Sequence, residues 1–114
     1  MIDISVYAYC SEYNRKGIVY FIRDGIGHIK IGVTHNIKNR LLTLQTANPL
    51  RLQYYVGLSV PSITKAYEIE RYLHEMFSDC RLCGEWFDEK KVIEFLNKET
   101  CELCGYTFNL EGIE

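Results

Sequence analysis

The 114-residue sequence predicts a small α+β domain in which helices flank an antiparallel sheet of three strands. Two runs rich in β-branched and aromatic residues are joined by a turn that contains glycine, and a third such run stands between two stretches of helical periodicity. A content of 47% hydrophobic and 25% charged residues is typical of a folded globular chain. The predicted element order is β-β-α-β-α-α, and the length fits one domain.

The first two predicted strands form a hairpin. GIVYFIR at 17–23 and HIKIGV at 28–33 have strand composition, and an Asp-Gly pair begins the turn between them. The hairpin brings Tyr20 and Lys30 face to face. Such a pair is either an accident of packing or part of a site, and the two strands alone leave both interpretations open.

The segment after the hairpin predicts a short amphipathic helix. Thr34 or Asn36 supplies its N-cap, and the Asn-Pro pair at 48–49 ends it. Its apolar positions at helical spacing are Ile37, Leu41 and Leu44. Lys38 and Arg40 lie off this apolar stripe, where they face either solvent or a ligand.

A third strand is predicted at 51–60, before Pro61, and a second helix follows it. Ser62 or Thr64 caps this helix, which runs to about Phe77. Its predicted buried stripe consists of Ala66, Ile69, Leu73, Met76 and Phe77.

Two polar residues of the second helix border that stripe. Glu70 and His74 are four residues apart and therefore share one face of the helix. After a predicted loop at 78–87, Asp88 caps a third helix that runs to about Lys98.

The chain is predicted to divide into an N-terminal extension at 1–16, the α+β domain at 17–98 and a C-terminal tail at 99–114. No apolar stretch approaches the roughly 20 residues of a membrane helix, and the N-terminus lacks the basic and apolar regions of an export signal. We therefore expect an intracellular protein with no membrane partner.

Charge is divided unevenly along the chain, although the net charge is only −2. Residues 15–51 hold seven basic side chains and one acidic side chain, and the remainder holds six basic and fourteen acidic, so the two parts carry +6 and −8. Phosphates attract clustered Lys and Arg, so the basic part points to a polyanionic partner. The alternative is chance clustering on a solvated face.

Five short motifs occur in order along the chain: GIVY at 17–20, KIGVT at 30–34, Arg40, the stretch YEIERYLHEMF around Glu70, and Arg81 with GEWF at 84–87. In this order and spacing the chain resembles the GIY-YIG nuclease superfamily, in particular the phage and large-virus branch whose second motif reads KIG. The resemblance covers about two thirds of the chain. It implies a metal-dependent endonuclease that hydrolyses phosphodiester bonds in DNA.

The resemblance also implies residue roles. Tyr20 would be the general base that takes a proton from water, and Glu70 would hold a catalytic Mg²⁺ or Mn²⁺ ion. Arg40 and Lys30 would clamp the scissile phosphate. The chemistry gives independent support, because Mg²⁺ is commonly held by one or two carboxylates and the arginine fork matches phosphate oxygens. Tyrosine is a poor base at its usual pKa of about 10, and a cation such as Lys30 beside Tyr20 would lower that pKa.

The chain departs from the family's pattern at two positions. Lys30 stands where many relatives have tyrosine, and Leu44 stands where many have histidine, so His35 or His74 is a candidate acid or base instead. Glu85 falls where some relatives place an amide that contacts the phosphate, and it either joins the metal or anchors its loop. The candidate catalytic residues are thus Tyr20, Lys30, Arg40, Glu70 and His74, and the candidate substrate-binding residues are His35, Lys38 and Glu85.

Four cysteines occur as two copies of one pattern, Cys80 and Cys83 in CRLCG and Cys101 and Cys104 in CELCG. The spacing C-x2-C-x17-C-x2-C fits a tetrahedral structural zinc site of two knuckles, which would join the tail to the GEWF loop. The alternative is that these are free cysteines.

Two classes of function stay open beside the DNA endonuclease. One is a catalytically inactive module, stabilised by zinc, that binds nucleic acid or a protein. The other is a purely structural zinc protein, which would leave the basic part without a role. One active site cuts one strand, so double-strand cleavage would call for a homodimer or a second encounter.

Overall fold

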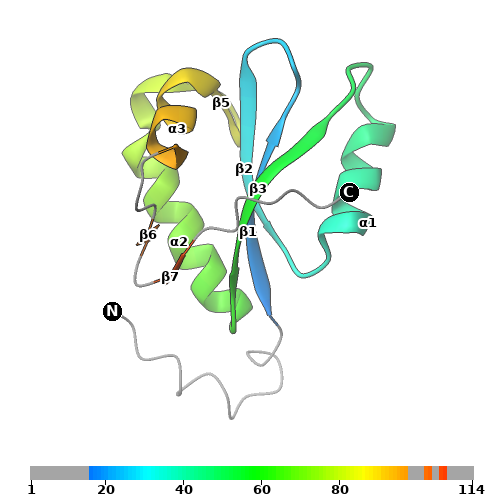
Figure 1. The fold of residues 1–114 in the computed structure, drawn as a ribbon. Coiled ribbons are helices and arrows are strands. Elements are labelled where there is room, and N and C mark those ends of the chain that lie inside the picture. Colours follow the sequence, from blue (N-terminus) through cyan, green and yellow to red (C-terminus); the bar gives the residue numbers. More distant parts are fainter. Residues whose placement is uncertain (1–15, 98–101, 104–105, 108–114) are drawn as a thin grey trace.

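The computed structural model describes residues 16–97 and the short strands at 102–103 and 106–107 (Figure 1). One antiparallel sheet has the strand order β3-β1-β2-β5-β4. Its strands are β1 (Gly17–Arg23), β2 (His28–Thr34), β3 (Gln53–Val60), β4 (Arg81–Cys83) and β5 (Trp86–Asp88). A separate two-stranded sheet pairs β6 (Glu102–Leu103) with β7 (Tyr106–Thr107). The α+β class is confirmed, and the prediction of three strands is wrong because the main sheet has five.

The two additional strands of the main sheet come from the predicted loop at 78–87. β4 and β5 are three residues long each, so neither is long enough to show the alternation that identifies a strand in a sequence. Gly84 lies between them with φ of +53°, a conformation that favours glycine. β5 pairs with β2, and β4 with β5, so the segment extends the sheet beyond the hairpin.

The turn between β1 and β2 is held by the side chain of Asp24. Its Oδ1 accepts hydrogen bonds from the backbone N–H groups of Ile26 (3.0 Å) and His28 (3.1 Å), and its Oδ2 lies 2.5 Å from His28 Nδ1. Burial acts to raise the pKa of Asp24, but these hydrogen bonds outweigh it and hold that pKa below its usual value. Gly25 and Gly27, with φ of +82° and +113°, supply the positive backbone angles that the turn requires.

The helices lie on both sides of the sheet (Figure 1). α1 (Ile37–Thr46) covers one face, and α2 (Ile63–Met76) with α3 (Glu89–Leu96) covers the other. Of the alternative caps, Asn36 accepts a hydrogen bond from Asn39 N–H and Ser62 accepts one from Lys65 N–H. Each helix in residues 16–97 is too short or too polar to span a lipid bilayer.

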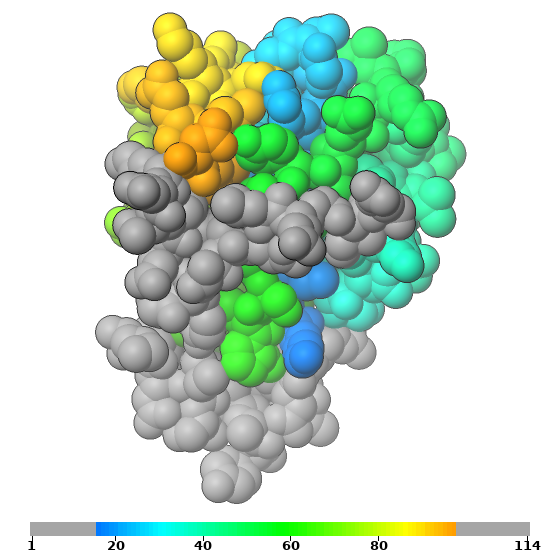
Figure 2. Space-filling model, viewed as in Figure 1, coloured from blue at the N-terminus to red at the C-terminus, as the bar shows by residue number. Residues whose placement is uncertain are grey.

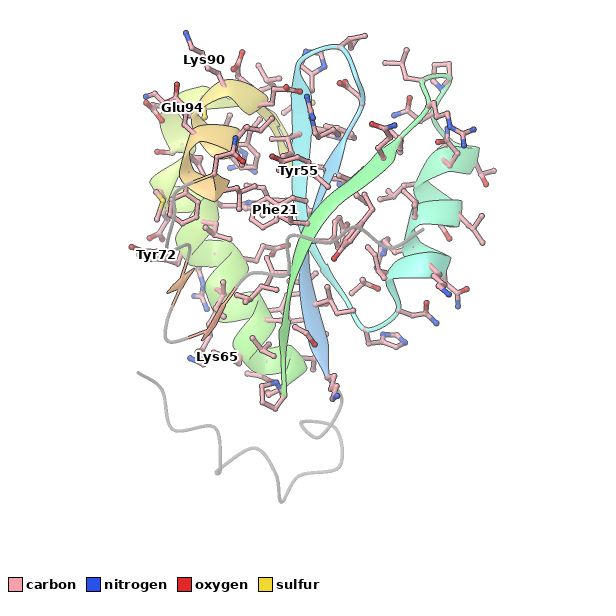
Figure 3. All side chains as sticks on the ribbon, in the orientation of Figure 1. Phe21, Tyr55, Lys65, Tyr72, Lys90 and Glu94 are labelled. Carbon is pink, nitrogen blue, oxygen red and sulfur yellow. The ribbon has the colours of Figure 1, made fainter. Side chains whose placement is uncertain are left out.

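The sheet therefore separates two apolar clusters. The larger, between the sheet and α2 with α3, includes Phe21, which points into that layer in Figure 3. It contains every predicted residue of the α2 stripe except Met76, whose side chain is 38% exposed at the helix end. The smaller cluster, under α1, has Tyr20, Ile22, Ile37 and Leu52 at its centre, with Ile18, Leu41, Leu44, Tyr54 and Trp86 against it.

Candidate functional site

The candidate site lies at the edge of β2, beyond the point where its pairing with β5 ends. β5 pairs with β2 only at residues 28–30, and the last backbone contact runs from Ile31 N–H to Glu85 O at 3.0 Å. Beyond that point α2 supplies the partner, because His74 Nε2 lies 2.9 Å from Ile31 O. A carbonyl oxygen only accepts hydrogen bonds, so Nε2 carries a proton in this contact. The ring of His74 also packs edge-on against Phe87, with centroids 5.0 Å apart.

Three potential metal ligands converge at this edge. One ligand atom from each of Glu70, His74 and Glu85 lies within 4.8 Å of the others, and all three residues are half-buried. Burial, and then the charge and hydrogen bond of Glu85, raise the pKa of Glu70 to about 7, while Lys30 acts against this rise. The negative charges of Glu70 and Glu85 therefore repel each other, and a cation bound between the two carboxylates would reduce this repulsion.

Tyr20 reaches the same edge from β1. It lies opposite Gly32 of β2, and a Cβ added at Gly32 would be 2.3 Å from the Tyr20 hydroxyl oxygen. The ring therefore crosses β2 in space that only glycine leaves free. Tyr20 is 1% exposed, and burial first, then the charge of Glu85, raises its pKa well above the ordinary value of 10, while Arg40 acts to lower it.

Lys30 does not activate Tyr20 in the way that the sequence suggested. In the hairpin register Lys30 lies opposite Ile22, so it is a diagonal neighbour of Tyr20 on the same face. Its Nζ is 3.0 Å from Glu85 Oε1 and 5.7 Å from the centroid of the Trp86 ring. The charge of Lys30 is thus compensated by Glu85, and the pKa of Tyr20 is raised.

Arg40 and His35 lie at the other end of β2. They line a pocket of about 330 Å³ formed by Thr34, His35, Asn36, Asn39, Arg40 and Thr43. Arg40 is exposed on α1, yet its charge still acts on Tyr20, which places the guanidinium beside the site. Lys38 is exposed on α1 and is not among the residues that line this pocket.

A larger pocket adjoins the cluster on the side of α2. It has a volume of about 540 Å³ and is lined by Tyr67, Glu70, Arg71, His74, Glu75, Ser78 and Arg81. Tyr67 and Arg71 were not predicted as site residues. The signal was available, since Tyr67 precedes Glu70 by three residues and His74 by seven, which places all three on one face of a helix. Arg81 also donates from Nε to Gly84 O at 2.7 Å, which holds the β4–β5 turn.

The predicted zinc site receives no support from its described half. Cys80 packs against the large apolar cluster, and its thiol donates to Phe77 O at 3.3 Å. Cys83 is exposed and lines a pocket together with Trp86, which packs on the opposite face of the sheet. Cys101 and Cys104 lie outside the described residues, so structural zinc stays a prediction.

The fold and this cluster define a small α+β protein with a site of two carboxylates, an imidazole, a lysine and a buried tyrosine at an open sheet edge. The chain belongs to the T5orf172 domain family, whose model matches residues 6–102. This match corrects the assignment to the GIY-YIG nuclease superfamily, which depended on a few short motifs within residues 17–87. No curated protein and no solved structure matches the chain significantly.

Proposed function

We propose that the protein is a metal-dependent endonuclease that hydrolyses phosphodiester bonds in DNA. The observation that carries the proposal is the convergence of Tyr20, Glu70, His74 and Glu85 at one edge of the sheet, with Arg40 acting on the same tyrosine. Phosphodiester hydrolysis requires a proton acceptor for water and positive charge at the phosphate oxygens, and this arrangement offers groups for each task.

The residues at the edge fit a divalent cation of the Mg²⁺ or Mn²⁺ type. Glu70, Glu85 and a ring nitrogen of His74 would hold it, and carboxylate oxygens with one imidazole suit Mn²⁺ and, through the oxygens, Mg²⁺. The raised pKa of Glu70 supports the proposal, since burial causes the rise first and repulsion from Glu85 second, and positive charge between the carboxylates would relieve that repulsion. When bound, the cation would supply charge stabilisation to the phosphate oxygens.

Tyr20 is the proposed proton acceptor. Its hydroxyl is held over Gly32 on rigid strands, so its position toward the edge is fixed before substrate binds. Its pKa is raised first by burial and second by the carboxylates of Glu85 and Glu70, with a smaller contribution from Tyr67, and Arg40 opposes these influences. Positive charge at Glu70 and Glu85 would oppose the second influence and make the tyrosine a better base.

Arg40 and Lys30 are the proposed phosphate clamp. Arg40 is exposed and forms no ion pair with another residue of 16–97, so its planar fork can meet a phosphate without breaking a pair in this part of the chain. Lys30 Nζ is 3.0 Å from Glu85 Oε1, and a phosphate bound beside Lys30 would share the positive charge of Lys30 with Glu85. His35 lines the Arg40 pocket and adds a hydrogen-bonding group there.

A second candidate function is a module that binds DNA without cutting it. The observation that favours this candidate is that the charges of the site compensate one another, with Lys30 paired to Glu85 and Tyr20 held as a neutral phenol. Both candidates predict DNA binding, so cleavage separates them.

The test is cleavage of supercoiled plasmid by the full-length protein with Mg²⁺, with Mn²⁺ and with neither. We expect cleavage that requires the metal and a rate lower by about 100-fold or more in Glu70→Gln. The matched control is Glu94→Gln, an exposed carboxylate on α3 (Figure 3), which should cut like the wild type. Intact plasmid with both metals, together with measurable DNA binding, would contradict the nuclease and favour the binding module.

A further inference from the structure

A pocket of about 360 Å³ that the proposed catalytic groups do not use lies at the turn end of the hairpin. Its lining comes from four segments, the β1–β2 turn, β2, the loop after α1 and the β4–β5 hairpin. The lining residues are Asp24, His28, Asn48, Leu82, Cys83 and Trp86. The hairpin turn and the loop after α1 both lie at the surface of the molecule in Figure 2.

The lining combines apolar surfaces with polar edges. Trp86 is half-buried, and Leu82, which is 53% exposed, lines the same pocket. His28 is fixed by Asp24, whose side chain is 6% exposed and lies 2.5 Å from Nδ1, so Nε2 stays available to a ligand. Asn48 Oδ1 accepts from Leu50 N–H, and in residues 16–97 its amide nitrogen has no protein partner.

Along β2 the pocket lies next to the proposed catalytic edge. Lys30 pairs in register with Trp86, and its Nζ lies 5.7 Å from the centroid of that ring. His28 is two residues before Lys30 on the same face of β2, a separation of about 7 Å in a strand. The face of β2 thus carries in succession the Arg40 pocket, the Tyr20 hydroxyl over Gly32, Lys30 and this pocket.

We propose that this pocket binds an unpaired nucleobase of the DNA strand, next to the phosphate that is cut. The inference rests on the proposed function and deepens it by naming the substrate class, DNA that is single-stranded or locally unpaired. A base offers a flat aromatic face, which suits Trp86 and Leu82, and a hydrogen-bonding edge, which suits His28 and Asn48. A base inside a duplex is stacked and paired, so it cannot present both surfaces at once.

Trp86 is the single tryptophan of the chain, so tryptophan fluorescence reports on binding in this pocket or directly beside it at Lys30. The experiment titrates full-length Glu70→Gln protein, which should bind without cutting, with a short single-stranded oligodeoxynucleotide. A series of the same oligonucleotide carries one abasic nucleotide at each successive position, and anisotropy of an end label measures affinity in parallel. We expect saturable quenching of Trp86, and one abasic position that weakens binding about 5-fold or more.

Two exposed leucines provide the matched variants. In the same Glu70→Gln protein, Leu82→Ala should weaken binding about 5-fold or more and abolish the dependence on the abasic position. Leu42→Ala, at a 67% exposed position on α1 outside the pocket, should bind like its parent. Thermal unfolding of each variant shows that it is folded.

Equal affinities across the abasic series, or a Leu82→Ala variant that binds as tightly as its parent, would contradict the proposal that this pocket binds a nucleobase. The outcomes for the pocket and for the nuclease are separable. If binding depends on the base but the wild type leaves the plasmid intact, the nucleobase pocket is supported and the nuclease activity is contradicted. Cleavage by the wild type without any base-dependent binding does the reverse.

Discussion

The face of the sheet under α2 and α3 is packed with apolar side chains, whereas the face under α1 carries two tyrosines, a lysine and two glycines among a smaller apolar group. On the first face Val19, Phe21 and Ile31 are fully buried and touch other apolar residues. On the second, Tyr20 stands between Gly32 and Gly57 in the neighbouring strands. The difference shows that one face stabilises the fold, while the other gives up packing to place polar groups.

The glycines explain how the second face holds its tyrosines. Tyr20 lies over Gly32, and the hydroxyl of Tyr54 lies over Gly57, where an added Cβ would be 2.0 Å away. The ring of Tyr20 therefore fills the space that a side chain at Gly32 would take on the neighbouring strand, and the ring of Tyr54 fills the space of a side chain at Gly57 on its own strand. Only Tyr20 is directed to the carboxylates, which makes Tyr54 its natural control.

The largest expected effect compares the two apolar clusters directly. Leu73, in the larger cluster, is fully buried, and Leu44, on α1, is half-buried against the smaller cluster. We expect Leu73→Ala to lower the free energy of unfolding by about 3 kcal/mol and Leu44→Ala by about 1 kcal/mol. Urea unfolding of the full-length variants measures both values, and equal losses would contradict the division of labour between the faces.

The next effect tests the space over the glycines. Gly32→Ala and Gly57→Ala are each expected to cost about 1–3 kcal/mol, because each new Cβ meets a tyrosine. At Gly57 the second contact, to Tyr54 Cζ, is 3.1 Å, so Tyr54→Phe should relieve most of the strain. At Gly32 the second contact, to Tyr20 Cζ, is 2.5 Å, so Tyr20→Phe should not. Thermal unfolding of the two double mutants decides, and equal relief in both would disprove the geometry.

The smallest effect concerns Glu70. Burial, and then the charge of Glu85, raise the pKa of this carboxyl to about 7. A carboxyl with a raised pKa stabilises the fold fully below its ordinary pKa of 4.5, and this stabilisation is lost as the pH rises through 7. Without divalent metal, Glu70→Gln should therefore stabilise the protein at pH 8 by about 1 kcal/mol, less than the pKa shift alone implies because solvent reaches the carboxyl. At pH 4 the gain should vanish. Unfolding curves at both pH values measure it, and a constant gain would count against the carboxylate pair.

The hairpin and the helix caps followed from local sequence rules. Asn36 and Ser62 were among the predicted caps, and the β-branched and aromatic composition at 17–23 and 28–33 gave the central strands nearly to the residue. The helical spacing of Glu70 and His74 correctly placed them on one face. These features depend on neighbours within a few residues, which a sequence displays.

The rest of the site depends on contacts between distant segments. The pairing of Lys30 with Glu85 follows from the position of β5 in the sheet, and β5 is too short to be recognised in the sequence. Gly32 was part of a motif, but its task as the space for Tyr20 appears only in the hairpin register. The family assignment failed for a related reason, because short motifs were given more weight than the pattern of the whole chain, which matches the T5orf172 domain over residues 6–102.

The central claim is that Tyr20 performs chemistry that Tyr54 does not, although both are tyrosines packed over glycine on one face of the sheet. The most direct test compares the plasmid cleavage rates of Tyr20→Phe and Tyr54→Phe with that of the wild type in Mg²⁺ or Mn²⁺. We predict that Tyr20→Phe cuts about 100-fold to 10,000-fold more slowly, the range for a lost general base, and that Tyr54→Phe cuts at the wild-type rate. Equal rates for the two variants would contradict the account.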